Sequence, residues 1–137
     1  MDANYTAVAT ANGRDGRAVS SDGKIDLPLS VPREMGGSGE GTNPEQLFAA
    51  GYAACFASAL AAVGRQGGQD VRDVSVTAEV GIGGDLRSGF GLSVVLRVEL
   101  PDELQDGTGK DLIDRAHQVC PYSNATRGNI PVELVIE

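Results

Sequence analysis

The chain has 137 residues and a formal net charge of −8, a size typical of one domain that buries a core without staples. An acidic chain repels phosphate backbones, and without tryptophan it offers few rings for base stacking, so we expect no nucleic-acid partner. Two cysteines are too few for a secreted disulfide framework, and the first residues show no secretory signal. We therefore expect one cytoplasmic domain over residues 1–137.

The first third of the chain predicts a β-meander. β-Branched residues alternate with others in residues 4–11, and a strand, an Asp22-Gly23 hairpin turn and another strand follow within residues 17–31. Pro28 places its strand at a sheet edge, because proline lacks a backbone N–H. The glycine-rich stretch 36–41 is interpreted either as a linker or as a lid over a site.

A long helix is predicted next. Asn43 or Thr42 is a suitable N-cap. Pro44 suits the first helical position, and Glu45 stands in the first turn, where negative charge is favoured. Residues 47–63 carry almost no polar side chains, which indicates a helix buried in the core. The run approaches the length that spans a membrane, but its alanines give little hydrophobic drive, so we expect no membrane segment.

The second half of the chain predicts two strands, a helix and a strand. Alternating apolar residues in 74–82 and 90–100 indicate an antiparallel pair. A helix should end near Cys120, because Pro121 disfavours helical geometry in the residue before it, and its inward residues are expected to be Leu112, Ile113, Ala116 and Val119. Residues 130–137 predict the last strand. This order is typical of an α+β domain with helices packed on an antiparallel sheet.

The two cysteines occupy different settings. Cys55 lies in the apolar helix, where a thiol is either an inert core residue or, if a cation is brought to it, a reactive thiolate. Cys120 lies at a helix C-terminus, where the helix dipole disfavours a thiolate. That position suits either core packing or a second thiol that reacts later.

Several arginines compete to be the cation, and composition does not choose among them. Arg14, in the turn 12–16, is one candidate, and Glu45 is a carboxylate suited to hold an arginine by a bidentate contact. The simpler interpretations are a solvated turn residue and a helix N-terminal acid. His117, the only histidine, is either a surface residue or the partner of Cys55 in a hydrolase. Two distant cysteines and one histidine lack zinc-ligand spacing, so no metal is expected.

Two long motifs resemble the organic hydroperoxide resistance branch of the OsmC/Ohr family. They are TNPEQLFAAGYAACF (42–56) and AHQVCPYSNATRGN (116–129). Residues 12–32 and 81–101 fit the same family in the same order, so the resemblance covers essentially the whole chain. Asn12 departs from it, because the family often has glycine there, and we expect only the turn to change.

The resemblance implies an α+β fold with antiparallel sheets wrapped on a long buried central helix, in an intertwined homodimer with two sites at its interface. It implies a thiol peroxidase in which Cys55 attacks an organic hydroperoxide and Cys120 resolves the product through a disulfide. It assigns Arg14 as the activating arginine, held by Glu45. The reductant would be dihydrolipoamide or a lipoylated protein, and no metal, flavin or other cofactor would be needed.

Helix geometry adds one expectation. Glu45 and Cys55 are ten residues apart, which is about 15 Å along a continuous helix. Both therefore cannot contact one arginine from the same helix. We predict that the Arg14–Glu45 pair serving one Cys55 comes from the other subunit.

The peroxidase interpretation also suggests a substrate class, and other functions remain as alternatives. Apolar walls would favour alkyl or fatty-acid hydroperoxides over hydrogen peroxide, and the candidates for these walls are Phe48, Phe56, Met35 and Phe90. One alternative is a non-catalytic redox-sensing or ligand-binding protein of the same fold. The others are a hydrolase that uses Cys55 and His117, and a structural dimer with inert core cysteines.

Overall fold

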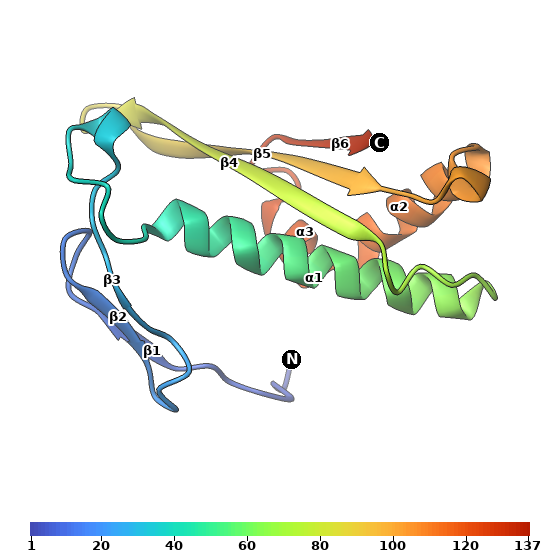
Figure 1. Ribbon diagram of the computed structural model, residues 1–137, viewed down its shortest axis with the longest axis horizontal. Helices are drawn as coiled ribbons and strands as arrows, with labels where there is room; N and C mark the ends of the chain where they lie inside the picture. The colour runs from blue at the N-terminus through green and yellow to red at the C-terminus, as the bar shows by residue number, and fades with distance from the viewer. The chain divides into compact units, whose positions relative to one another are not determined.

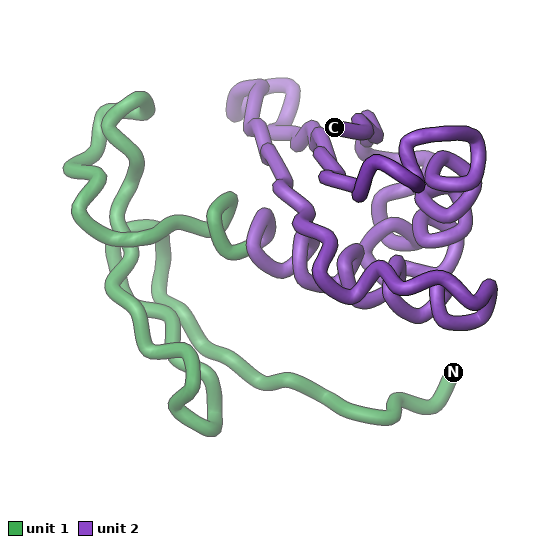
Figure 2. Tube along the Cα trace, turned by 45° about the vertical axis from the view of Figure 1, so that its right-hand side comes forward, with its two compact units in different colours: residues 1–47 green, residues 48–137 purple.

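The computed structural model describes residues 1–137. The chain divides into two compact units, Met1–Leu47 and Phe48–Glu137 (Figure 2). The first unit contains three short strands, and the second contains most of a long helix, a three-stranded sheet and two further helices (Figure 1).

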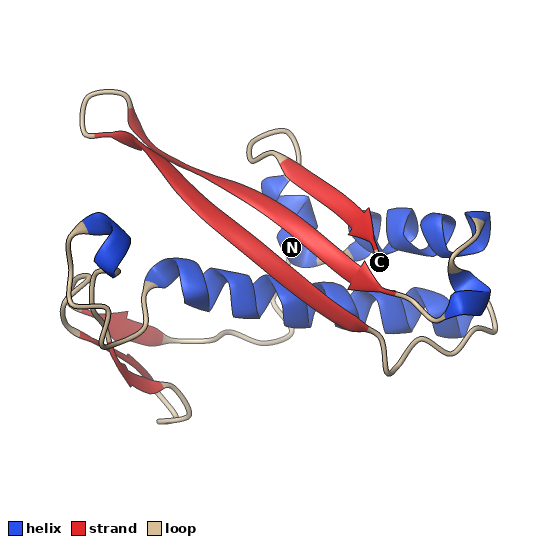
Figure 3. Ribbon diagram, turned by 45° about the horizontal axis from the view of Figure 1, so that its top comes forward, coloured by secondary structure: helices blue, strands red, loops and turns tan.

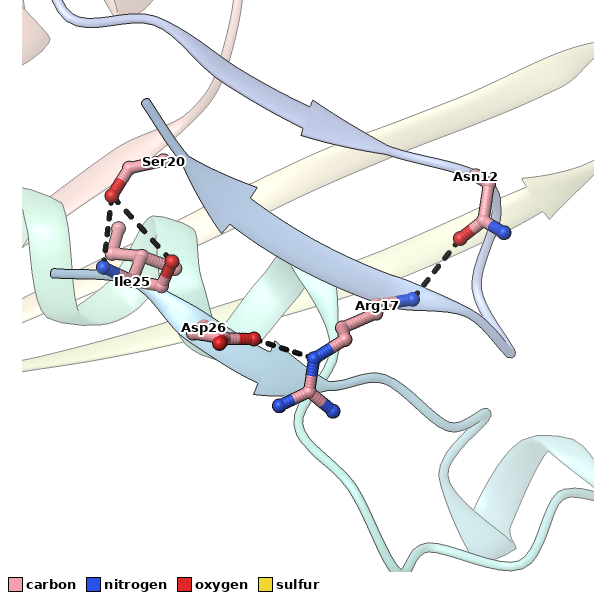
Figure 4. A network of polar contacts seen from close by, with 5 residues as sticks. All are labelled: Asn12, Arg17, Ser20, Ile25 and Asp26. Carbon is pink, nitrogen blue, oxygen red and sulfur yellow. Dashed lines mark hydrogen bonds and ion pairs between the residues drawn. The ribbon is translucent and has the colours of Figure 1, made fainter. Parts of the chain in front are cut away.

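The first unit is built on a small antiparallel sheet in the order β1-β2-β3. Its strands are shorter than predicted: β1 is Ala9–Ala11, β2 is Arg17–Ser20 and β3 is Asp26–Pro28. Pro28 lies on an edge strand, as predicted. The predicted hairpin turn is confirmed between β2 and β3, where Ser20 Oγ accepts a hydrogen bond from the Ile25 N–H at 2.9 Å (Figure 4).

The glycine-rich stretch is packed closely against the chain that precedes it. A short 3₁₀ helix, η1 (Arg33–Met35), leads into it. A Cβ atom at Gly37 would overlap the carbonyl oxygen of Val31, and one at Gly41 would overlap that of Pro28. The glycines are therefore needed for close backbone approach, which the sequence interpretations of linker and lid did not include.

The long helix α1 runs without interruption over Pro44–Gln66. Asn43 is its cap, because its Oδ1 accepts the Gln46 N–H at 2.8 Å, whereas Thr42 bonds the Gln46 side chain. Within this chain only one face of α1 is buried, so the helix is less buried than predicted. The buried residues are Tyr52, Phe56, Ala59, Leu60, Val63 and Gly64.

Helix α1 is long and apolar enough, by length and composition alone, to cross a membrane. The core helix of a soluble protein passes the same test. The buried face of α1 belongs to the hydrophobic core of the second unit, and 33% of its apolar window is buried.

The second unit has a sheet in the order β4-β5-β6. Strands β4 (Ser75–Asp85) and β5 (Gly89–Glu99) form the predicted antiparallel pair. Strand β6 (Val132–Ile136) pairs in parallel with β5, which differs from the antiparallel prediction. The reason is the long helical connection between them, which returns the chain to the end of the sheet where β5 begins.

That connection contains η2 (Asp102–Leu104), α2 (Gly107–Val119) and α3 (Pro121–Thr126). Helix α2 ends where predicted, and the short helix α3, which the sequence did not predict, begins at Pro121. The buried residues of α2 are Gly109, Leu112, Ile113 and Ala116, and Cys120 after them is also buried, whereas Val119 is 53% exposed. The inward placement predicted for Val119 is therefore wrong, because Cys120 occupies the buried position instead.

The core of the second unit lies between the sheet and the helices, which cover one face of the sheet (Figure 3). Strand β5 contributes alternate residues to it, as a half-buried strand should. These residues are Val94, Leu96 and Val98, followed by Leu100. The predicted α+β class is confirmed.

Candidate active site

Arg14 and Glu45 form a bidentate ion pair in the first unit. Arg14 Nη1 donates to Glu45 Oε2 at 2.9 Å, and Nη2 donates to Oε1 at 2.7 Å. This contact lowers the pKa of Glu45, whose side chain is only 12% exposed, and raises the pKa of Arg14. The sequence prediction that Glu45 holds an arginine is consistent with this geometry, and the pair presents a fixed cation.

The turn that carries Arg14 is closed by Asn12. The Asn12 side chain accepts the backbone N–H of Arg17 at 3.1 Å (Figure 4). A Cβ atom at Gly16 would overlap Asn12 Oδ1, so Gly16 leaves room for this contact. Arg17 also pairs with Asp26 on β3. Asn12 therefore stabilises the turn through its side chain, whereas the sequence predicted only a change in the turn.

The two cysteines meet in the second unit. Their sulfur atoms lie 3.3 Å apart, and both are free thiols. Cys55 is half-buried on α1, and Cys120 is fully buried between α2 and α3, where it caps the end of one helix and the start of the other. Residues 65 positions apart in sequence are therefore placed almost within bonding range.

The surroundings of Cys55 oppose a thiolate within this chain. Burial raises the pKa of the Cys55 thiol, and the neighbouring Cys120 raises it further. The backbone N–H of Tyr122 acts in the other direction and lowers the pKa. The net shift is upward, so a reactive Cys55 needs a cation from elsewhere, as the sequence predicted.

A buried polar network, not predicted from the sequence, fixes α3 onto α1. Tyr52 Oη lies 2.8 Å from Ser123 Oγ and 3.2 Å from Thr126 Oγ1. All three side chains are almost fully buried. A tyrosine inside an otherwise apolar helix was the one signal that a buried hydroxyl partner exists.

His117 belongs to the same network. Its Nδ1 lies 2.8 Å from Ser123 Oγ. Burial and the nearby Arg127 lower the pKa of the imidazole. The histidine is thus engaged with Ser123, and no hydrogen bond joins it to Cys55, which a Cys-His hydrolase requires.

The proposed apolar wall residues have different environments. Phe56 has no exposed surface and packs in the core, so it does not line an open pocket. Phe48 contacts the rings of Tyr52 and Tyr122, while Met35 and Phe90 are exposed.

Two further features bear on ligands. A surface hollow of about 540 Å³ lies elsewhere in the second unit, and its lining includes the carboxylates of Asp70, Asp73, Glu99 and Glu103. Neither cysteine lines this hollow. No group of three or more His, Cys, Asp or Glu side chains is placed to hold a metal ion.

Comparisons with known proteins place the chain in a family. The family model for OsmC-like proteins matches residues 37–135. An organic hydroperoxide resistance protein of Xanthomonas axonopodis pv. citri (strain 306) is 56% identical over 135 residues, covering 96% of this chain and 94% of that protein.

Crystal structures of similar proteins agree in sequence and fold. The organic hydroperoxide resistance protein of Elizabethkingia anophelis is 46% identical, with a TM-score of 0.90 over 100% of this chain and 99% of that chain. The OhrB protein of Bacillus subtilis is 41% identical, with a TM-score of 0.87 over 98% of this chain and 100% of that chain. The chain belongs to the OsmC-like family, in its organic hydroperoxide resistance branch.

Proposed function

We propose that the chain is a cysteine-based peroxidase that reduces organic hydroperoxides to alcohols in the cytoplasm. The observation that carries the proposal is the 3.3 Å separation of the Cys55 and Cys120 sulfur atoms. A disulfide bond measures about 2.05 Å, so a shift of roughly an ångström joins the two thiols. The names of the similar proteins supply the substrate class.

In the proposed reaction the Cys55 thiolate attacks the distal oxygen of ROOH. The O–O bond breaks, the alkoxide takes a proton to become ROH, and Cys55 becomes a sulfenic acid. Cys120 then attacks the Cys55 sulfur. The S–S bond forms, the S–O bond breaks, and the hydroxide leaves with a proton as water.

The thiolate needs a cation, and we assign that role to Arg14, held by Glu45. Because α1 is continuous from Pro44 to Gln66, Glu45 lies about 15 Å along the helix from Cys55 of the same chain. The pair that serves one Cys55 would therefore come from the second subunit of a homodimer. There Arg14 would stabilise the thiolate and orient the peroxide.

The Cys55–Cys120 disulfide would be reopened by a dithiol through thiol exchange. The family resemblance points to dihydrolipoamide or a lipoylated protein. The first thiol of such a dithiol attacks the disulfide, and the second closes a ring that releases both cysteines reduced. An alkyl substituent on the peroxide would gain about 0.8 kcal/mol per buried methylene, so organic hydroperoxides should be preferred over hydrogen peroxide.

The test is consumption of cumene hydroperoxide and of hydrogen peroxide with dihydrolipoamide as the reductant. Wild type should consume the organic peroxide faster, Cys55→Ser should be inactive, and Cys120→Ser should react once but recycle poorly. Failure of the wild type to turn over, with slow alkylation of both thiols, would instead indicate inert core cysteines. A redox sensor would be oxidised by peroxide without turning over.

The Cys-His hydrolase is a weaker candidate, because His117 is bonded to Ser123. His117→Ala should leave most of the peroxide consumption in place. Loss of a hydrolytic activity in that variant, with no peroxidase activity in the wild type, would reverse the assignment.

A further inference from the structure

Gly51 lies on α1 one helical turn before Cys55. Glycine is a poor helix residue, and alanine is the better choice at most helical positions. A Cβ atom at Gly51, however, would lie 2.9 Å from Tyr122 Oη and 3.2 and 3.3 Å from two of its ring carbons. The missing side chain leaves a notch in the helix surface that the edge of the Tyr122 ring occupies.

Aromatic residues on the same face of α1 flank this notch. The centre of the Tyr122 ring lies 5.8 Å from that of Phe48 and 5.7 Å from that of Tyr52. Phe48 lies three residues before Gly51 and four before Tyr52, and Cys55 lies four residues after Gly51 and three after Tyr52, which places them on one helix face. The Tyr122 ring is therefore packed against Phe48, Gly51 and Tyr52.

The backbone N–H of Tyr122 has no partner within α3. Tyr122 is the second residue of α3, so no carbonyl within the helix accepts its N–H. Pro121 before it has no N–H to offer. The Tyr122 N–H acts to lower the pKa of the Cys55 thiol, although burial raises that pKa more. Two residues earlier, Cys120 places its sulfur 3.3 Å from the Cys55 sulfur.

We propose that Tyr122 is a positioning residue, whose ring, seated in the Gly51 notch, holds the start of α3 against α1 and so keeps Cys120 beside the Cys55 sulfur. The inference rests on the proposed function only in taking Cys55 as the attacking thiol. The ring fixes the position of Tyr122, and the Tyr122 N–H, which acts to lower the pKa of the Cys55 thiol, moves with the ring. The same seat keeps Cys120 in place to attack once Cys55 carries a hydroxyl group.

The test is the pH dependence of Cys55 alkylation by iodoacetamide, measured in a Cys120→Ser background so that Cys55 is the only thiol. Gly51→Ala should displace the ring and raise the pH at which Cys55 becomes reactive. Alkylation at neutral pH should slow by about tenfold, which corresponds to one pKa unit.

Gly64→Ala is the matched control. It makes the same change on the same helix, and its Cβ would crowd Val71 Cγ2 at 2.5 Å, away from the thiols. It should lower the stability of the protein but leave the Cys55 alkylation profile unchanged. An equal shift in both variants would mean that any strain on α1 disturbs Cys55, and would overturn the proposal.

Variants at Tyr122 complete the test. Tyr122→Phe removes Oη, the closest atom to the notch, and should restore part of the reactivity lost in Gly51→Ala. Tyr122→Ala should slow Cys55 alkylation by itself. Adding Gly51→Ala to it should slow alkylation no further, because the ring is already absent. Additive effects, or an unchanged profile in Gly51→Ala, would refute the proposal.

This outcome is separate from that of the proposed peroxidase activity, because alkylation needs no peroxide. A shifted alkylation profile in Gly51→Ala, together with a wild type that does not turn over peroxide, would support the positioning role of Tyr122 and refute the peroxidase activity. An active wild type, together with an unshifted alkylation profile in Gly51→Ala, would support the peroxidase activity and refute the positioning role of Tyr122. In the active case, Gly51→Ala should also slow disulfide formation after one equivalent of cumene hydroperoxide, while Gly64→Ala should not.

Discussion

Cys55 and Cys120 place their sulfur atoms 3.3 Å apart, although one lies in the middle of a long helix and the other at the junction of two helices. Neither helix contains both residues, so the contact is a product of packing. The junction at Cys120 is held from two sides: the Tyr122 ring rests on α1, and Ser123 bonds Tyr52. Packing alone therefore brings the two sulfur atoms to within roughly an ångström of disulfide-bond length.

Peroxide should consume both thiols of one chain together. After one equivalent of cumene hydroperoxide, the wild type should lose two hydrogens by intact mass and bind no dimedone, because Cys120 removes the sulfenic acid quickly. Cys120→Ser should instead be labelled by dimedone at Cys55. Disulfide-linked dimers on a non-reducing gel would contradict an intramolecular bond.

Replacement of Arg14 by lysine should impair the reaction severely. Lysine cannot make the two-pronged contact with Glu45. We expect kcat/KM for cumene hydroperoxide to fall by about 100-fold. The pKa of Cys55, measured from the pH dependence of its alkylation rate, should rise. Arg17→Lys, an exposed position in the same turn region, is the control and should stay near the wild type. Equal losses in both variants would point to general damage to the turn.

Subunit mixing tests whether Arg14 acts on the partner's cysteine. Cys55→Ser and Arg14→Ala homodimers should each be nearly inactive. In a mixed dimer, the intact Cys55 of one subunit would meet the intact Arg14 of the other. Co-expression of the two variants should then recover about a quarter of wild-type activity, since half of the dimers are mixed and one of their two sites is complete. No recovery would favour an arrangement within one chain.

The Arg14–Glu45 pair should make stability depend on pH in acid. Because the pKa of Glu45 is lowered in the folded protein, the pair stabilises the fold above the ordinary glutamate pKa of about 4.3. That contribution is lost as the pH falls through the lowered value.

The free energies of unfolding of wild type and Glu45→Gln should therefore differ at pH 7 and converge in acid. Glu40→Gln, at an exposed glutamate outside the ion pairs, controls for the loss of one negative charge. A gap between wild type and Glu45→Gln that stays constant with pH would show that the pair does not carry this dependence.

The Tyr52 hydroxyl should contribute measurably to stability. Tyr52→Phe deprives two buried hydroxyls, on Ser123 and Thr126, of a partner. Each keeps a second contact, so the loss in unfolding free energy should be near the lower end of the range for buried polar groups, about 1 kcal/mol. Tyr122→Phe, whose residue is partly exposed, should lose less in the same denaturant titration.

Much of the local structure was predictable from short stretches of sequence. The start of α1 follows from Asn43 and Pro44, and the end of α2 follows from Pro121, because capping and proline sterics act within a few residues. The family motifs also indicated the four residues proposed for the site, and the Arg14–Glu45 contact is present as expected.

The sequence by itself thus determined where α1 begins, where α2 ends and which side chains have the chemistry for a thiol site. Only the tertiary structure decided that β6 pairs in parallel, that Tyr52 shares its hydroxyl with α3, and that Gly51 accommodates the Tyr122 ring. These features depend on packing between segments far apart in the chain. A pattern of nearby residues predicts which face of a helix is apolar, but it does not predict which segment packs against that face.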